Sequence, residues 1–300
     1  MAPKAKRSGG NPLSAKAVMA DLTVHHWTGR KLDQAITTET NQRYHAEEDA
    51  GRYNKLLIPK EAFAEVYAVV RASRRRHFQL TMPWHDEGPR LLPAIIYEQY
   101  AKEFREFRAQ FDKAADNFER AYPSYVGAAN KRLKNMFRAY DYPPPRKVRA
   151  MFSFDLFYTP CPDVEDFRVD VAKEHVEDMK ENLETQLKMG ISRALNEPLR
   201  RTIEVVGKMA TKLEEYVPAT DEEDADNVFR DSLVNNIREL LPLLTAFNLT
   251  DNKDLEQLAA RVEEDLCEHD AKVLREDDDV RAQVQEAAAE ILAKAQALLA

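Results

Sequence analysis

Residues 97–118 read YEQYAKEFREFRAQFDKAADNF, and this stretch decides the fold class. Its apolar residues recur every three or four positions over three heptads, and charged side chains fill most of the positions between them. Such spacing places the apolar side chains on one face of an α-helix, at the repeat that paired helices use. The sequence therefore predicts a long helix that starts at Pro93 and packs through an aromatic stripe. The stripe consists of Tyr97, Tyr100, Phe104, Phe107, Phe111, Ala114 and Phe118.

A second helix is expected to fold back on the first. Tyr122 and Pro123 are expected to end the first helix, because a proline disfavours the helical conformation of the residue before it. Residues 124–140 predict an antiparallel partner, which gives a helical hairpin over residues 93–140. Three consecutive prolines within residues 141–145 are expected to break the helical structure after it.

Alternating apolar and polar residues predict several short strands. The longest of these segments spans residues 148–158, and residues 24–27, 77–82 and 167–170 fit the same pattern over fewer positions. Together they suggest a small sheet of two to four strands beside the hairpin. A further helix is expected over residues 59–75, since a proline suits the first turn of a helix.

From about residue 171 the pattern is helical almost to the C-terminus. Pro198 interrupts the first of these stretches and predicts a kink or a restart. The predicted helical stretches cover residues 176–216, 229–244, 255–266 and 279–299.

The predicted fold class is mainly α, with a long helical hairpin, a helix bundle and a small antiparallel β-sheet. Residues 1–15 are basic and are predicted to form a disordered tail. Residues 16–170 are predicted to form a basic, aromatic-rich α+β domain. Residues 171–300 are predicted to form an acidic helical region, with a linker near residues 218–227.

The charge of the chain is divided between its halves. Residues 1–150 hold 27 Lys and Arg against 17 Asp and Glu, a net +10. Residues 151–300 hold 17 against 35, a net −18. This division is typical of a polyanion-binding region, of electrostatic pairing between the halves, or of two helical bundles with different surfaces. The sequence leaves these three interpretations open.

The composition excludes several classes of protein. Two cysteines exclude a disulfide scaffold and a four-cysteine zinc site. With 8 glycines and no GxSxG, HExxH or CxxC motif, the chain carries no familiar nucleotide, hydrolase or zinc signature. No apolar run approaches the roughly 18 residues that span a bilayer, and the first residues do not resemble a secretory signal. We therefore expect a cytoplasmic protein with no membrane partner, no cofactor and no metal.

A cluster of arginines marks the candidate nucleic-acid site. Residues 71–77 read RASRRRH, and guanidinium groups form charge-assisted hydrogen bonds with phosphates. Nearby aromatic rings are candidates for stacking on unpaired bases. The alternative is a solvated helix C-terminus, where cations also favour the helix dipole. The candidate residues are Arg71, Arg74, Arg75, Arg76 and Trp84, with Lys131, Arg132 and Lys134 from a shorter basic run.

A histidine beside two carboxylates, at residues 85–87, has the groups that general acid–base catalysis uses. No nucleophile or third group stands at a fixed spacing from it. The sequence therefore favours a protein that is not an enzyme.

Several short blocks resemble a family of uncharacterised proteins encoded by tailed bacteriophages and prophages. The resemblance covers most of residues 22–265, and it implies a phage origin and a largely helical fold but no reaction. The blocks are WTGRKLD at 27–33, GRYNKLL at 51–57, PWHDEGPRLLP at 83–93, FRVD at 167–170, FRDS at 229–232 and NIREL at 236–240.

On this resemblance, the polar members of the blocks become site candidates. Alternatively, Arg–Asp pairs such as Arg30 with Asp86 serve only to lock the sheet to the hairpin. The candidates are Arg30, Asp33, Arg52, Lys55, Trp84, Asp86 and Arg90.

The first functional hypothesis is a non-catalytic, phage-type protein that acts through protein–protein contacts. Its basic and acidic halves would supply complementary surfaces, and it would self-associate into a homo-oligomer. The alternative is a nucleic-acid-binding protein that prefers single strands and uses the basic, aromatic half. A third hypothesis is an enzyme with a site near Trp84.

Overall fold

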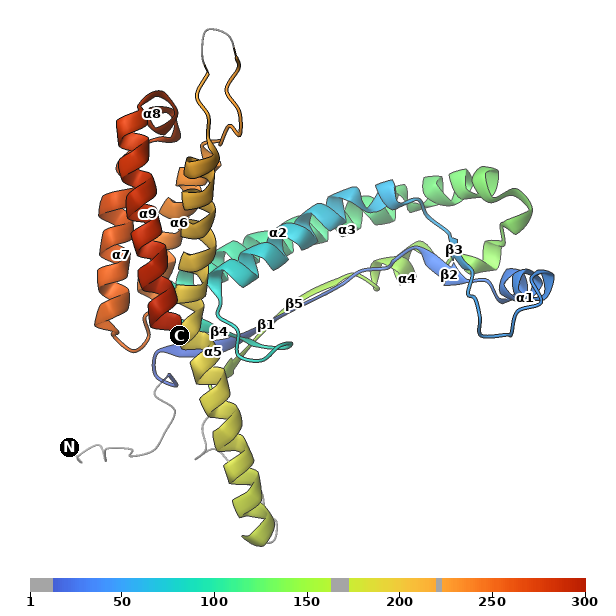
Figure 1. Cartoon of the computed structure of the whole chain (residues 1–300). Coiled ribbons are helices and arrows are strands. Elements are labelled where there is room, and N and C mark those ends of the chain that lie inside the picture. Colours follow the sequence, from blue (N-terminus) through green and yellow to red (C-terminus); the bar gives the residue numbers. More distant parts are fainter. Residues whose placement is uncertain (1–12, 163–172, 220–222) are drawn as a thin grey trace. The chain divides into compact units, whose positions relative to one another are not determined.

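The computed structural model describes residues 13–162, 173–219 and 223–300. The fold is mainly helical with a small antiparallel sheet, which confirms the predicted mainly α class with a minor β part (Figure 1). The strands are β1 (Ala17–His25), β2 (Arg30–Leu32), β3 (Asn54–Leu56), β4 (Arg90–Pro93) and β5 (Ser153–Pro160). The helices are α1 (Gln34–Arg43), α2 (Ala64–Leu80), α3 (Tyr97–Leu133), α4 (Pro145–Arg149), α5 (Lys173–Glu215), α6 (Ser232–Phe247), α7 (Lys253–Leu266), α8 (Ala271–Glu276) and α9 (Asp278–Leu299). Short 3₁₀ helices cover Lys60–Phe63, Ala94–Ile96, Lys134–Met136 and Ala139–Asp141.

Some predicted features lie outside the described residues. They are the first 12 residues of the basic tail, the strand predicted at 167–170, and residues 220–222 of the linker.

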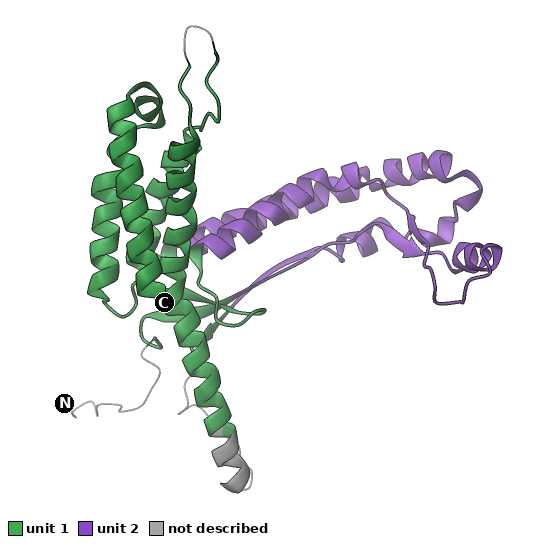
Figure 2. Cartoon of the chain, viewed as in Figure 1, with its two compact units in different colours: residues 1–20, 80–98, 158–300 green, residues 21–79, 99–157 purple. Residues whose placement is uncertain are grey.

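The chain forms two compact units (Figure 2). Unit 1 holds residues 1–20, 80–98 and 158–300, and unit 2 holds residues 21–79 and 99–157. By sequence, unit 2 carries 22 Lys and Arg against 15 Asp and Glu, a net +7, whereas unit 1 carries 22 against 37, a net −15. The two signs of charge are therefore sorted by unit.

In unit 2, helices α2 and α3 pack antiparallel through the predicted aromatic stripe. The rings of Phe63 and Phe118 stack with their centroids 4.6 Å apart at one end of the pair. At the other end, His77 Nδ1 lies 2.7 Å from Tyr100 Oη. The stripe therefore packs against α2 and, through Phe111, against the rings of Phe152 and Phe154 near the start of β5. The hairpin predicted over residues 93–140 is wrong.

Helix α3 continues through Pro123 to Leu133, so the predicted end at Tyr122 is also wrong. A proline inside a helix loses one hydrogen bond and crowds the preceding turn. Packing on both sides of Pro123 offsets this cost. The Tyr122 ring lies 5.7 Å from that of Trp27, and the Tyr125 ring lies 5.6 Å from that of Phe118.

Residues 77–80 belong to helix α2, and the strand predicted at residues 77–82 is wrong. The alternation of Phe78, Leu80 and Met82 imitates a strand, but Phe78 is 54% exposed. The residues of α2 also follow a longer repeat, with mostly apolar or small side chains every three or four positions. This repeat favours a helix, because it buries five side chains on one face of α2. These are Val66, Val70, Ser73, His77 and Leu80.

The three-stranded sheet has the order β4-β1-β5. Strands β1 and β4 pair antiparallel, with Met19 opposite Leu91. The strand predicted at residues 24–27 overlaps the end of β1. The strand predicted at residues 148–158 begins later, at Ser153, because Pro145 starts the short helix α4 instead. Strands β2 and β3 form a separate antiparallel pair.

In unit 1, α5 packs against α6 and α9, and α7 packs against the same two helices. Pro198 lies inside α5, which runs on without a restart. Its neighbours Ala194 and Leu199 are buried, and Thr202 Oγ1 donates to the Pro198 carbonyl at 2.9 Å. Among the residues that the structure describes, no helix combines the length and the hydropathy needed to cross a bilayer.

Candidate functional site

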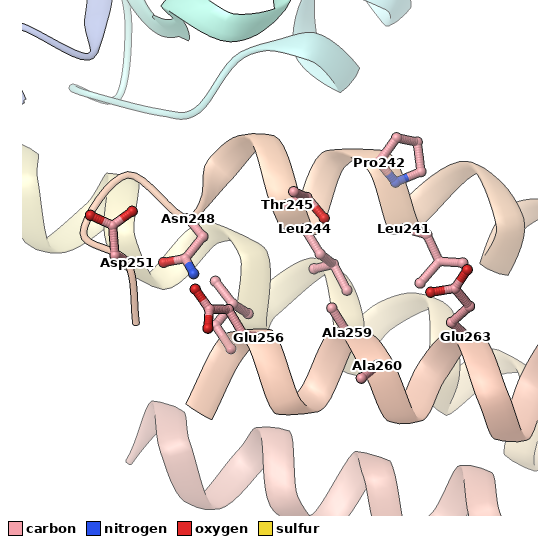
Figure 3. Close-up of a pocket in the computed structure, with 11 residues that line it drawn as sticks. Leu241, Pro242, Leu244, Thr245, Asn248, Asp251, Glu256, Ala259, Ala260 and Glu263 are labelled. Atoms are coloured by element: carbon pink, nitrogen blue, oxygen red, sulfur yellow. The ribbon is translucent and has the colours of Figure 1, made fainter. Parts of the chain in front are cut away.

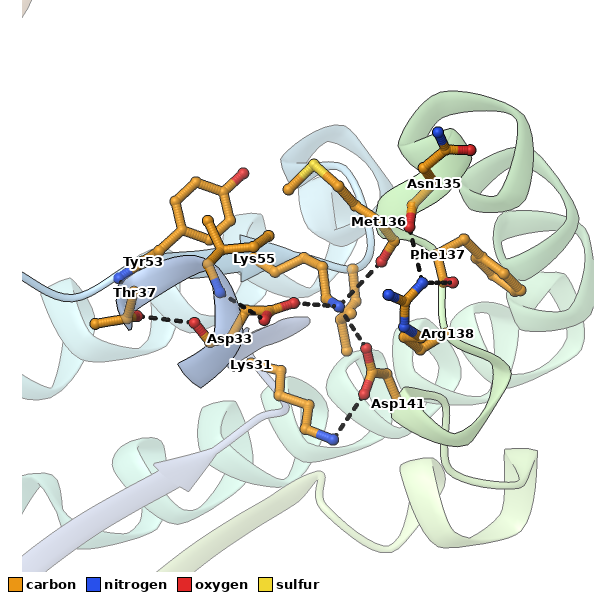
Figure 4. Close-up of polar contacts among 12 residues, drawn as sticks. Lys31, Asp33, Thr37, Tyr53, Lys55, Asn135, Met136, Phe137, Arg138 and Asp141 are labelled. Atoms are coloured by element: carbon orange, nitrogen blue, oxygen red, sulfur yellow. Dashed lines mark hydrogen bonds and ion pairs between the residues drawn. The ribbon is translucent and has the colours of Figure 1, made fainter. Parts of the chain in front are cut away.

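Two of the predicted site residues, Asp33 and Lys55, meet in a buried polar network in unit 2 (Figure 4). Lys55 Nζ lies 2.7 Å from Asp33 Oδ2, 2.7 Å from Asp141 Oδ2, and donates to the Met136 carbonyl at 3.1 Å. Lys31 Nζ donates to the second oxygen of Asp141 at 2.7 Å. Local structure sets this arrangement, since Lys31 and Lys55 are cross-strand partners on β2 and β3, and Asp33 caps α1.

Burial makes this network sensitive to the loss of any member. The side chains of Lys55 and Asp141 are only 2% and 3% exposed, whereas Asp33 is 17% exposed. Asp141 Oδ2 lies 2.7 Å from Lys55 Nζ and has no other polar partner within the described ranges, so this buried oxygen depends on that ammonium. An unpaired charge at such a position is costly.

The network also shifts the pKa values of its members. Burial favours the neutral form of Lys55, but hydrogen bonds to Asp141 and Asp33 outweigh it and raise the Lys55 pKa above its ordinary value. The hydrogen bond from Lys55 holds the pKa of Asp33 below its ordinary value. Burial opposes the same change in Asp141, yet Lys31 and Lys55 lower its pKa as well. All three groups are therefore charged near neutral pH, and each is paired with another member of the network.

The predicted arginine cluster divides between the two flanks of α2. Arg76 turns toward α3, where Nε and Nη2 donate to the two carboxylate oxygens of Glu103 at 2.6 and 2.9 Å. Arg71, Arg74 and Arg75 are exposed and form no ion pair within the described part of the chain. Arg74 reaches β1, donating to the Val24 carbonyl at 3.4 Å. Three of the four guanidinium groups are therefore exposed and without an ion pair in the described part of the chain, whereas Arg76 is paired with Glu103.

One flank of α2, the one that does not carry Arg76, holds a stripe of aromatic and basic residues. The stripe consists of Tyr67, Arg71, Arg74 and Phe78. Their spacings of four, three and four residues place them in line, over about 16 Å at 1.5 Å per residue. Tyr67 is half-buried beside the His26 ring, at 5.1 Å between centroids, and Phe78 is exposed. We call these four residues the α2 stripe.

The other basic candidates of unit 2 differ in their contacts with the rest of the unit. Arg132 donates to the carbonyls of Leu56 and Leu57 at 2.5 and 3.2 Å, which fastens α3 to β3. The remaining candidates in this unit are exposed: Arg30, Arg52, Lys131 and Lys134.

The candidates in unit 1 are structural. Trp84 is 2% exposed and packs in a core with Met82 and Leu91, so the prediction that its ring stacks on bases is wrong. Asp86 is 91% exposed and pairs with Arg193 at 3.0 Å, in place of the predicted Arg30.

Arg90 is half-buried on β4. Its guanidinium donates to the hydroxyl and the carbonyl of Thr81 at 2.8 and 3.1 Å. Burial lowers its pKa to about 10. Arg90 therefore contributes to the fold of unit 1.

A groove of about 500 Å³ lies between α6 and α7 in unit 1 (Figure 3). Leu241 and Leu244 form part of its apolar lining, and Asp251, Glu256 and Glu263 supply carboxylates. Asp251 already pairs with Lys16 at 2.8 Å. Within the described ranges, no group of three or more His, Cys, Asp or Glu is placed to hold a metal ion.

Sequence reasoning missed several residues that complete these sites. Asp141 was noted only as part of a proline-rich break, and it lies 110 residues from Lys31. Tyr67 and Phe78 are among the aromatic rings that the sequence places near the arginine cluster, but proximity alone does not predict that they share one helix flank with Arg71 and Arg74. The spacing of these four residues is a signal the sequence does contain.

No protein-family model, no curated protein and no solved structure matches the chain. The resemblance to a phage-encoded family therefore stays a prediction.

Proposed function

We propose that unit 2 binds single-stranded nucleic acid along the α2 stripe. The observation that carries the proposal is the alignment of two cations, Arg71 and Arg74, between two aromatic rings on one flank of α2. Cations that follow the backbone and rings that stack on bases are the two elements that sequence-tolerant single-strand binders combine.

The electrostatics of unit 2 support this proposal. Arg71, Arg74 and Arg75 have no acidic partner among the described residues, so binding a phosphate costs no existing ion pair. The net charge of +7 on unit 2 attracts a polyanion at longer range. Arg76, in contrast, would have to leave Glu103.

Single strands are favoured over duplex because Phe78 presents an exposed ring. A ring gains stacking energy only from a base whose face is free, and duplex bases are already stacked. A duplex of the same sequence is therefore expected to compete only weakly with the single strand for the α2 stripe.

Replacing Arg71, Arg74 and Arg75 together with Ala is expected to weaken binding of a labelled single-stranded oligonucleotide at least tenfold. The slope of log affinity against log salt should fall by about two, because each phosphate contact in a single strand contributes about 0.7. Fluorescence anisotropy at several salt concentrations measures both quantities.

The matched control removes three cations from unit 2 on the far side of α3. Lys102, Arg105 and Lys113 are exposed and lie opposite the buried face of that helix. Their replacement with Ala should leave most of the affinity. Equal losses in the two triple variants, or tight binding by the Arg71, Arg74 and Arg75 variant, would disprove the proposed surface.

A second candidate function is self-association through protein–protein contacts. The observation that favours it is the sorting of charge, with net +7 on unit 2 and −15 on unit 1. Opposite charges on separate units suit head-to-tail contact between copies. Light scattering should then show an oligomer at low salt that dissociates at high salt, whereas a monomer at both would contradict it.

A further inference from the structure

A pocket of about 350 Å³ opens in unit 2 at the Tyr67 end of the α2 stripe. Thr28, Arg30, Lys60 and Tyr67 line it. All four side chains carry hydrogen-bond donors, and no carboxylate contributes to the lining. Arg30 and Lys60 form no ion pair with any residue of the described ranges. The residues that line the pocket therefore carry two positive charges without an ion-pair partner in the described ranges and two hydroxyl groups.

The backbone beneath the pocket is held in one conformation. Gly29, between Thr28 and Arg30, has φ +64°, and a Cβ there would lie 2.9 Å from Phe63 Cζ. Its carbonyl accepts from the amides of Leu57 and Ile58 at 2.7 and 3.3 Å. This position requires glycine, and it fixes the start of β2, where Arg30 lies.

Tyr67 is also held in place. Its ring stacks on Phe63 at 5.7 Å between centroids, and Phe63 is buried against α3. A donor set that is ordered before the ligand arrives loses less entropy on binding.

We propose that this pocket binds the terminal phosphate monoester of a nucleic-acid strand whose following nucleotides lie along the α2 stripe; this inference rests on the proposed function. Tyr67 belongs to both the pocket and the stripe, so a strand can run from one to the other. A phosphate monoester carries −1.5 to −2 charges near neutral pH, whereas an internal phosphodiester carries one. Two cations without acidic partners match the monoester better. The volume lies in the range that holds a nucleotide-sized group.

The test compares three labelled oligonucleotides of one sequence: one with a 5′-phosphate, one with a 3′-phosphate, and one with hydroxyls at both ends. Full-length protein is expected to bind one of the phosphorylated strands about tenfold more tightly than the hydroxyl-ended strand. Lys60→Met should abolish that difference. Lys102→Met, which removes an exposed cation from α3, should retain it.

The outcomes separate the two proposals. If the hydroxyl-ended strand binds but neither phosphate improves its affinity, the pocket proposal fails and the proposed function stands. If no strand binds, both fail. A further arm uses a nucleoside monophosphate as competitor, and it should compete only at far higher concentration than the phosphorylated strand. If it competes equally well, the pocket binds free nucleotides, and the strand-end assignment is wrong.

Discussion

Replacing Lys55 with Met is expected to lower the free energy of unfolding of unit 2 by about 3–5 kcal/mol, because it leaves the buried Asp141 with only the half-exposed Lys31 as counter-ion. Lys55 is the link between Asp33 and Asp141, and the Asp141 oxygen that faces it has no other polar partner in the described part of the chain. Methionine fills a similar volume, so the change removes the charge without opening a large cavity. Urea unfolding, with hydrogen exchange to localise the effect to unit 2, measures the loss.

Two further variants separate burial from ion pairing as such. Lys208 pairs with Glu204 at 2.6 Å, but both side chains are about two-thirds exposed, so Lys208→Met should cost less than about 1 kcal/mol. The double variant Lys55→Met with Asp141→Leu also removes the Asp141 carboxylate, which has lost Lys55 in the single variant. It should therefore recover part of the stability. If Lys55→Met costs no more than Lys208→Met, the network does not stabilise the fold as described.

The same network gives the wild-type protein a defined pH dependence. The pKa values of Asp33 and Asp141 are lowered by folding, so their contribution is present above their unfolded values and is lost as the pH falls through the folded ones. The pKa of Lys55 is raised, so its contribution is lost only as the pH rises through its folded value. Stability from this network should be level between about pH 5 and pH 10. The double variant should show a weaker acid loss.

Helical periodicity allowed most of the fold to be predicted, and it failed where two repeats competed or where packing overrode a local rule. The stripe from Tyr100 to Phe118 is buried as its heptad spacing indicates, except for Phe107, which is half-buried. Residues 77–82 fit a strand only when read apart from the longer helical repeat before them. Pro123 should end a helix by local rules, but the aromatic packing around it lies too far apart in sequence to be recognised.

The candidate site was predictable only in part. Asp33 and Lys55 were selected for their place in short blocks, and they do meet. Asp141 was not, since no spacing rule connects residues 110 positions apart. For Trp84, residue type suggested stacking, but whether a ring is buried depends on the helix packed against it. The charge division was predictable from the sequence, and the net charges differ more between the two halves of the chain, +10 and −18, than between the two units, +7 and −15.

Trp84→Ala is expected to destabilise unit 1 by about 3–5 kcal/mol, through lost burial and the cavity left behind. Its ring lies directly over Gly190 in α5, where a Cβ would come within 2.7 Å of Trp84 Cε2. Trp84 is buried in unit 1, so its loss should leave the oligonucleotide affinity of the folded protein unchanged. Urea unfolding and fluorescence anisotropy at a temperature where the variant is folded measure the two effects.

Gly190→Ala tests the contact between Trp84 and α5 by changing Gly190 instead of the ring. Its effect on the free energy of unfolding should be opposite in sign with tryptophan and with alanine at position 84. With Trp84 present, the added methyl must displace the ring and should destabilise by about 1–3 kcal/mol. In the Trp84→Ala background the obstacle is gone, and the higher helix propensity of alanine should stabilise by up to about 1 kcal/mol. Gly207, also in α5, is the matched control: a Cβ there would lie 3.6 Å from Leu292 Cδ1, an ordinary contact, so Gly207→Ala should stabilise in both backgrounds. If Gly190→Ala has the same effect with and without the tryptophan, the close packing of Trp84 on α5 is not what holds this part of unit 1 together.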